Sequence, residues 1–198
     1  MAKTLITAPP LFVDFDDADH VDLEHWSKLL SRVLRHRPDL VGIKLDKAGW
    51  ASIEKLIAKL QVRDPAWDLA RLMMVVQRND KQRFELNRDR KRIRAVHGHS
   101  VPVELGYRPS RPPEYLFHGT TRVALSGIRD KGILKGHRRY VHLSVDRTTA
   151  MSVGSRRGRA IVLSVRTGDM HRAGFPFVCS SNGVWLVDRV PVEFIAFE

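Results

Sequence analysis

The 198-residue chain carries 34 Lys and Arg against 22 Asp and Glu, a formal charge of +12, and 43% of its residues are hydrophobic. A chain of this length can bury the core of one larger domain or of two small lobes. Its longest apolar run, around 160–165, is far short of the roughly 20 residues of a membrane helix, so we expect no membrane partner. The single cysteine, Cys179, excludes a disulfide framework and a cysteine-rich zinc site, and favours a reducing, cytoplasmic location.

The charge is unevenly distributed along the chain. Residues 1–24 hold six acidic residues and one basic residue, and we expect residues 1–21 to form an acidic, flexible leader. The remainder carries 33 basic and 16 acidic residues, and both halves share the excess. A positive field of this size favours a polyanionic partner, with nucleic acid as the leading candidate.

The next part of the chain has the periodicity of three helices. Apolar residues from Trp26 to Leu34 recur at helical spacing, and we expect Asp22 to cap this helix and Pro38 to end it. Ser52 can cap a second helix. The pair Asp64-Pro65 predicts the start of a third, because proline is favoured at the first helical position.

Strand-like segments accompany these helices. Residues 50–51 predict a short strand, and the runs 82–86 and 92–96 flank the turn 87–90, so they predict a hairpin. Three helices followed by a basic hairpin is the element order of a winged helix. We therefore assign residues 22–99 to one lobe.

A segment rich in proline and glycine follows, and residues 100–113 are expected to link two lobes. In residues 114–198, helical stretches fit 121–131 and 147–153, the second capped by Asp146. The predicted strands of this lobe are 115–118, 140–144, 160–165, 176–179, 184–187 and 193–197. Many short strands with two helices indicate a compact α+β lobe, so the whole chain is expected to be α+β.

Several common catalytic motifs are absent from the sequence, which has no HExxH, P-loop, GxGxxG or GxSxG pattern. His97 and His99 could both face a metal ion, but no third ligand stands near them in the sequence. A structural or polar role is therefore favoured for this pair, and no metal site is expected.

Seven segments in chain order carry a resemblance to a known family. They are residues 34–38, 79–84, 92–100, 116–121, 141–144, 153–158 and 182–186. Together they resemble the NAD-dependent RNA 2′-phosphotransferase family over residues 22–198. The resemblance implies an N-terminal winged-helix lobe that binds RNA and a C-terminal ADP-ribosyltransferase-like lobe of mixed α/β structure that binds NAD.

The reaction implied by the resemblance removes an internal RNA 2′-phosphate in two steps. The phosphate attacks the anomeric carbon of the nicotinamide ribose and expels nicotinamide. The ribose 2″-hydroxyl then attacks that phosphate, which releases RNA with a free 2′-hydroxyl and ADP-ribose 1″,2″-cyclic phosphate. NAD is thus consumed as a co-substrate and no metal is required. We expect a monomer that acts on tRNA-like RNA, as at a splice junction.

Arginine suits a phosphate dianion, because its planar fork binds two oxygens at once and stays charged. The positions that match the family's catalytic arginines and histidine are Arg35, His36, Arg83 and Arg156. Lys81 lies two residues before Arg83, so on a strand both side chains would share a face and could reach one phosphate.

The NAD-binding element of the family is matched by His118, Gly119 and Thr120. The resemblance implies that the histidine bonds a ribose hydroxyl and that the glycine lets backbone groups approach the nicotinamide amide. His142 and Ser144 would stand on a second strand beside the nicotinamide. Residues 182–186 match the strand on which many ADP-ribosyltransferases carry a catalytic Glu, and this segment contains no Glu. That absence agrees with a phosphate nucleophile, which is already ionised and needs no base.

Further basic residues are expected to bind RNA or its phosphates. They are Arg92, Arg94, His99 and Arg157. The first three lie in a segment that matches the family at its ends but not at its centre. Arg157 belongs to a basic rim, whose other members are Arg138, Arg139, Arg156 and Arg159. The alternative interpretation of this rim is an ordinary run of solvated charges.

Two other functions fit part of the sequence. An ADP-ribosyltransferase that caps terminal phosphates of nucleic acids would use the same arginines. A non-enzymatic winged-helix protein that binds nucleic acid would explain residues 22–97 and the charge, but it would leave the histidine and glycine elements of the second lobe without a purpose.

Overall fold

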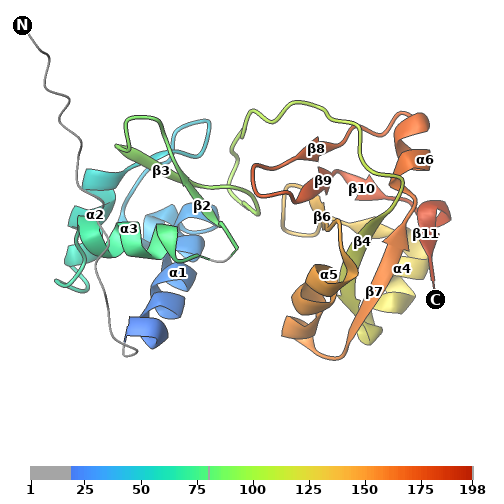
Figure 1. The fold of residues 1–198 in the computed structure, drawn as a ribbon, viewed down its shortest axis with the longest axis horizontal. Coiled ribbons are helices and arrows are strands. Elements are labelled where there is room, and N and C mark those ends of the chain that lie inside the picture. Colours follow the sequence, from blue (N-terminus) through green and yellow to red (C-terminus); the bar gives the residue numbers. More distant parts are fainter. Residues whose placement is uncertain (1–18, 80, 198) are drawn as a thin grey trace, which may run out of the picture.

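The computed structural model describes residues 19–79 and 81–197 (Figure 1), so the first 18 residues of the predicted leader lie outside the described residues. Helix α1 spans Asp19–Arg35 and therefore begins before Asp22, so the prediction that Asp22 caps it is wrong. The positive end of the helix dipole favours acidic residues in the first turn, and here the end of the acidic segment joins the helix. The helix ends ahead of Pro38, as predicted.

Helices and a small antiparallel sheet enclose the first hydrophobic core. After α1 come the 3-10 helix η1 (Pro38–Val41), β1 (Ala51–Ser52), α2 (Ile53–Gln61), α3 (Leu69–Gln77), β2 (Phe84–Leu86) and β3 (Arg92–Ala95). The strands pair in the order β1-β3-β2, and the hairpin register places Leu86 opposite Ile93. Each helix turns one apolar face inward, and the fully buried members include Leu30, Leu56, Leu60 and Leu72.

The helix starts in this half were predicted with mixed success. Ser52 caps α2 as predicted, but α3 begins later than expected. Its N-cap is Asp68, whose carboxylate accepts a hydrogen bond from the backbone N–H of Arg71 at 2.7 Å. Asp64 instead forms a tight turn, accepting a backbone N–H two residues later at 3.0 Å. This turn brings Trp67, only 1% exposed, into the core.

The second half has its own core between short sheets. Its elements are β4 (Leu116–Thr121), η2 (Arg122–Ala124), α4 (Leu125–Lys131), β5 (Ile133–Leu134), β6 (Val141–Leu143), α5 (Arg147–Gly154), η3 (Ser155–Arg157), β7 (Ala160–Val165), α6 (Thr167–Arg172), β8 (Val178–Cys179), β9 (Trp185–Val187), β10 (Arg189–Val190), η4 (Val192–Phe194) and β11 (Ile195–Ala196). They form the antiparallel sheets β11-β7-β4, β6-β9-β8 and β10-β5. A bridge between Phe117 and Ser144 joins the first two sheets, so β4 and β6 lie side by side.

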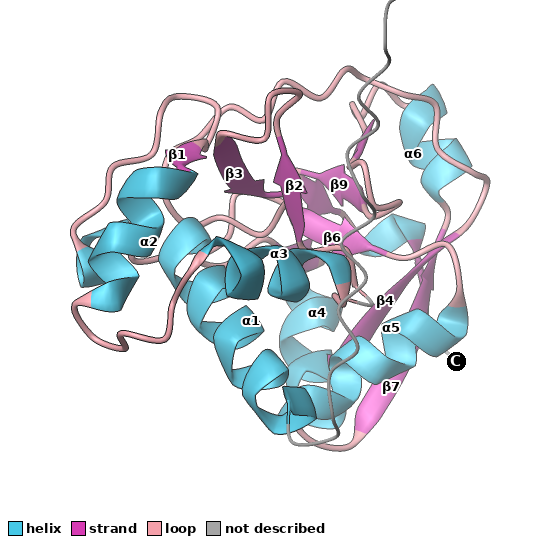
Figure 2. Cartoon of the chain, turned by 60° about the vertical axis from the view of Figure 1, so that its left-hand side comes forward, coloured by secondary structure: helices cyan, strands magenta, loops and turns pink. Residues whose placement is uncertain are grey.

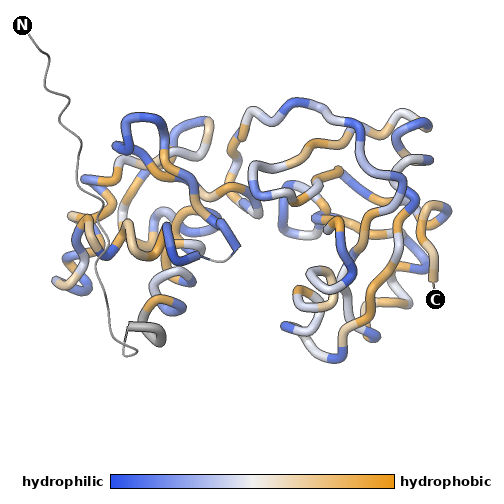
Figure 3. The backbone as a smooth tube through the Cα atoms, in the orientation of Figure 1, coloured by the Kyte–Doolittle hydropathy of each residue, from blue (hydrophilic) through white to orange (hydrophobic). Residues whose placement is uncertain are grey.

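All six strands predicted for this half are present, most of them shorter than expected. The strand at 160–165 agrees in both limits, and its hydrophobic colour is evident along β7 in Figure 3. Asp146 caps α5 as predicted, accepting the N–H of Thr149 at 2.6 Å. The sequence did not predict α6, β5 or β10, because elements of two to six residues are too short for a periodic pattern. The chain is thus α+β, and Figure 2 shows its helices and strands. It has two separate hydrophobic cores.

The segment between the two cores is anchored at both ends. The N–H of Glu104 donates to the carbonyl of Lys47 at 2.7 Å, and the N–H of Ser110 donates to the carbonyl of Phe177 at 2.8 Å. The segment therefore ties the two cores together. Among residues 19–79 and 81–197, no helix has the length and apolar character needed to cross a membrane.

Candidate active site

Arg35 ends α1 at the junction of the two halves. Within the described residues, its buried Nε and Nη2 have no hydrogen-bond partner. The loop that follows β3 packs against it: Gly98, with φ +87°, is so close that a Cβ there would lie 3.6 Å from the Arg35 Nη1. The N–H of Ser100 donates to the Arg35 carbonyl at 2.9 Å. A guanidinium held this way, with buried donors unsatisfied, is suited to an anion.

The positive charges of three further arginines act on Arg35. Burial, followed by the charges of Arg83, Arg138 and Arg156, lowers the pKa of Arg35 to about 10. One of them comes from the first half and two from the second, so the cluster is assembled across the junction. We call Arg35, Arg83, Arg138 and Arg156 the arginine cluster. Repulsion among four cations is unfavourable unless a polyanion binds among them.

Arg83 is braced within its own half. Its Nη1 donates to the hydroxyl of Ser27 and to the Oδ1 of Asn79, both at 3.1 Å. The same Asn79 Oδ1 accepts the N–H of Lys81 at 3.2 Å. The prediction that Lys81 and Arg83 share one face of a strand is wrong, because β2 begins at Phe84. A loop presents both residues instead.

His36 lies beside the cluster, where its Nδ1 contacts the hydroxyl of Ser100 at 3.0 Å. Burial, with the charges of Arg35 and Arg138, lowers its pKa. The imidazole is therefore mostly neutral at pH 7 and can exchange hydrogen bonds with a bound phosphate or ribose without adding charge.

Arg138 is more central than the sequence indicated, where it was only one member of a basic rim. Its Nη1 lies 3.3 Å from the Nδ1 of His142. Its positive charge also contributes to the lowered pKa values of His36, His97 and His118. The only signal in the sequence was its place just before the strand that carries His142.

The predicted NAD-binding residues stand on adjacent strands. His118 on β4 has its Nδ1 3.1 Å from the carbonyl of His142 on β6. Ser144 exchanges two backbone hydrogen bonds of 2.8 Å with Phe117. Burial lowers the pKa of His118 and, more strongly, that of His142, whose ring lies 5.0 Å from that of His97. The structure thus brings His118, His142 and Ser144 together beside the arginine cluster.

Gly119 has a packing role that the sequence did not reveal. A Cβ at this position would lie 1.7 Å from the carbonyl oxygen of Ala150, because α5 crosses directly over β4. Gly154 of α5 is also tightly packed, because a Cβ at this position would lie 3.0 Å from the carbonyl oxygen of Thr120. Thr120 pairs with Ile161 of β7. Contact of these residues with a nicotinamide stays a prediction.

The residues predicted to bind RNA have varied surroundings. Arg92 is exposed and pairs with Asp46 at 3.3 Å. Arg94 pairs with Glu85, donates to the carbonyls of Ala48 and Leu105 at 3.1 and 3.3 Å, and stacks on Trp50. Arg156 and Arg157 lie in η3. These contacts give the two hairpin arginines structural roles, and RNA binding by them and by Arg157 stays a prediction.

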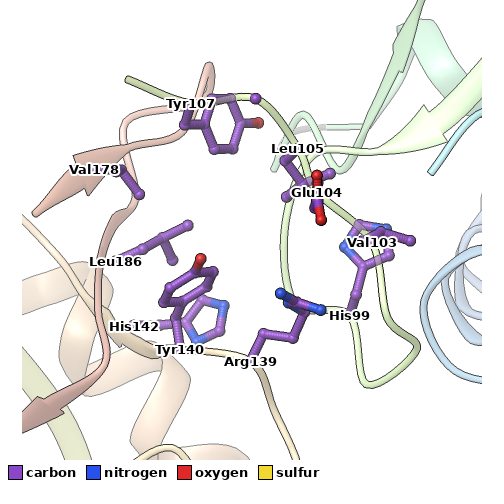
Figure 4. Close-up of a pocket in the computed structure, with 12 residues that line it drawn as sticks. His99, Val103, Glu104, Leu105, Tyr107, Arg139, Tyr140, His142, Val178 and Leu186 are labelled. Atoms are coloured by element: carbon purple, nitrogen blue, oxygen red, sulfur yellow. The ribbon is translucent and has the colours of Figure 1, made fainter. Parts of the chain in front are cut away.

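A cavity of about 150 Å³ lies between the halves on the side of the connecting segment (Figure 4). His99, Arg139 and His142 line it, together with Leu105 and Tyr107 of that segment. His99 is only 2% exposed, and burial, with the charges of Arg35 and His36, lowers its pKa to about 4. Such a buried imidazole supports the junction from within. In the part of the chain that the structure describes, no group of three potential metal ligands occurs.

Comparison with known proteins shows the family to which the chain belongs. The profile of the family described as "RNA 2'-phosphotransferase, Tpt1 / KptA family" matches residues 22–189. A probable RNA 2′-phosphotransferase of Pseudomonas aeruginosa strain UCBPP-PA14 is 49% identical over 178 residues, covering 89% of this chain and 98% of the relative. Proteins with the same description are 48% identical in Flavobacterium johnsoniae, over 87% of this chain and 94% of the relative, and 44% identical in Escherichia coli, over 88% and 95%. The chain therefore belongs to the RNA 2′-phosphotransferase family.

Proposed function

We propose that the protein removes an internal 2′-phosphate from RNA by transferring it to the ADP-ribose portion of NAD. The observation that carries this proposal is the arginine cluster, in which Arg35 has buried donors without a partner in the described residues and feels the positive charges of arginines from both halves. A 2′-phosphate next to a phosphodiester brings about three negative charges to one ribose, and such a cluster complements them. The basic surplus of the chain supports an RNA substrate, and we infer a tRNA-like one.

We infer that the chain has two lobes, one around each hydrophobic core, and that the two lobes bind different substrates. Residues 22–99 form a winged-helix lobe for RNA, residues 100–113 the link, and residues 114–198 an ADP-ribosyltransferase-like lobe for NAD. The order of three helices and a hairpin supports the first assignment. The adjacent strands β4 and β6, which carry His118 and Ser144, support the second. We expect the enzyme to work as a cytoplasmic monomer.

The first step needs positioning more than proton transfer. A phosphate monoester is ionised at pH 7 and attacks without a base, so the cluster only has to hold it in line with the nicotinamide ribose. The lowered pKa values of His36 and His142 keep these rings neutral there. They would orient hydroxyl groups through hydrogen bonds. Four arginines already supply the positive charge.

The NAD-binding residues fit the co-substrate in their chemistry. His118 and His142 are buried polar groups, and the Nε2 of His142 has no partner within the described residues. A ribose or carboxamide offers both donors and acceptors to such atoms. We assign ribose and nicotinamide contacts to His118, Gly119, Thr120, His142 and Ser144. NAD supplies the electrophilic anomeric carbon.

The second step is a transesterification at phosphorus, in which charge on the phosphate oxygens is redistributed. Preorganised cations contribute most at this stage. Two hydrogen bonds brace Arg83 within its own half, and Lys81 stands on the same loop. We assign these two side chains to the second step, with Arg35, His36 and Arg156 holding the phosphate in both.

The test is incubation with NAD and an RNA that bears one internal 2′-phosphate. We expect RNA with a free 2′-hydroxyl, nicotinamide and a cyclic ADP-ribose phosphate, each seen by chromatography. A matched RNA with only a terminal phosphate is the comparison substrate. If the terminal phosphate is modified and the internal one is left in place, the protein is an end-capping transferase and the proposal is wrong.

A further inference from the structure

The side-chain amide of Asn182 connects the two halves at the edge of the arginine cluster. Its Nδ2 lies 3.1 Å from the carbonyl oxygen of Lys81, 3.3 Å from that of Gln82 and 3.3 Å from the Nε2 of His97. Its Oδ1 accepts a hydrogen bond from the hydroxyl of Ser180 at 2.8 Å. All polar atoms of this amide are therefore engaged, and three of the four contacts cross from the second half to the first.

The partners fix the direction of the amide. Backbone carbonyls can only accept hydrogen bonds, so the group that faces Lys81 and Gln82 must be the NH₂. The ring of His97 must then offer an unprotonated Nε2. This agrees with its surroundings, since burial and the charges of Arg35 and Arg138 lower the pKa of His97 to about 3.

The loop that Asn182 contacts contains a residue in a strained backbone conformation. Gln82 has a φ of +41°, in the left-handed region that is unfavourable for a residue other than glycine. Its N–H donates to the carbonyl of Asn79 at 2.8 Å. The next residue is Arg83, whose charge reaches Arg35. A small rotation at Gln82 would therefore move Arg83 relative to the cluster.

We propose that Asn182 is a positioning residue, which holds the loop of Lys81, Gln82 and Arg83 in the conformation that binds the 2′-phosphate. The inference rests on the proposed function and extends it, because it makes phosphate recognition in the first half depend on a side chain of the second. Asn182 has no assigned contact with the reacting atoms. It acts through the two carbonyls that it bonds.

Binding without NAD tests this dependence directly. The dissociation constant is measured for a short RNA with one internal 2′-phosphate and for the same RNA with a 2′-hydroxyl. We expect Asn182→Ala to reduce the preference for the phosphorylated RNA about tenfold, the effect of losing one to two neutral hydrogen bonds. In turnover, the KM for RNA should rise and the KM for NAD should stay the same.

Two further variants separate donation from packing. Asn182→Asp keeps the shape but places an oxygen opposite two carbonyls, so it should lose the preference at least as strongly as Asn182→Ala. Ser181→Ala is the matched control, because the Ser181 hydroxyl also crosses the junction but donates to Glu85 of β2, at 3.3 Å, and not to a carbonyl of the loop. It should bind both RNAs as the wild type does.

The results that would overturn the role of Asn182 differ from those that would overturn the proposed function. Unchanged preference in Asn182→Ala or Asn182→Asp overturns the inference, as does an equal loss in Ser181→Ala. Thermal midpoints equal to that of the wild type exclude unfolding as the cause of a loss. Release of nicotinamide by the wild type tests NAD dependence separately, because the binding preference is measured in its absence.

Discussion

Replacing Arg83 by alanine should slow the second chemical step more than the first. The first step needs a phosphate held in place, and Arg35 and Arg156 remain for that purpose. The second step redistributes charge on the phosphate oxygens, where a fixed cation has its largest effect. RNA that carries ADP-ribose on its 2′-phosphate should therefore accumulate in this variant.

The size of the effect follows from how Arg83 is held. Two acceptors at 3.1 Å, from Ser27 and Asn79, fix its guanidinium before the substrate arrives. Loss of one such preorganised group costs about 10²–10³ in rate. Asn79→Ala removes part of the brace and leaves the charge, so it should cost less, on the order of tenfold. We therefore expect the rate of the second step to fall from the wild type to Asn79→Ala and further to Arg83→Ala.

Gel analysis of labelled RNA over time distinguishes the steps. Arg88→Ala removes one exposed positive charge from the hairpin turn of the same half and controls for net charge. His118→Ala should weaken NAD binding and reduce both steps, without accumulation of the intermediate. If Arg83→Ala leaves only unreacted substrate, then Arg83 acts in binding or in the first step, and the reasoning is refuted.

Acid should destabilise the fold through His99, whose pKa is about 4 in the folded protein and about 6.5 when unfolded. The unfolded chain then binds more protons, so this residue lowers the unfolding free energy by about 2 kcal/mol as the pH falls from about 7.5 to 5. Denaturant titrations should find a smaller loss in His99→Gln. The exposed His137→Gln should show the same loss as the wild type. Gly119→Ala should lower stability by about 3 kcal/mol or more, because its Cβ would meet the Ala150 carbonyl; a thermal midpoint like that of the wild type would contradict the packing at 1.7 Å. RNA binding should weaken steeply with salt and show little sequence preference, and titrations at two or more salt concentrations check both expectations.

The parts of the fold that the sequence predicted are those determined locally. The strand at 160–165 is a continuous apolar run, and Asp146 caps α5 through a hydrogen bond to a residue three positions later. The start of α3 shows where local rules fail. Asp64 and Asp68 are both suitable caps, and only the burial of Trp67 in the tertiary core decides between them.

The candidate site was only partly predictable for a related reason. The match to the family identified Arg35, His36 and Arg83, but it could not show that a loop, not a strand, presents Arg83. The sequence places Asn182 in the segment 182–186, which carries part of the resemblance, and gives it no role of its own. Its amide instead bonds residues about 100 positions earlier, and no pattern within one segment encodes such a contact.

The arginine cluster also gives a physical reason for the proposed assembly of the site from both halves. Arg35 lies at the end of α1, where it is buried with donors unsatisfied, and the charges of Arg138 and Arg156 approach it from the second half. A single small lobe could bury a guanidinium close to other positive charges only at a large electrostatic cost. At a junction, each half folds around its own apolar core, and the unfavourable contacts form only where the two meet. In the proposed function a bound phosphate would offset this repulsion, so the charges that oppose one another at the junction are those we propose to bind the substrate.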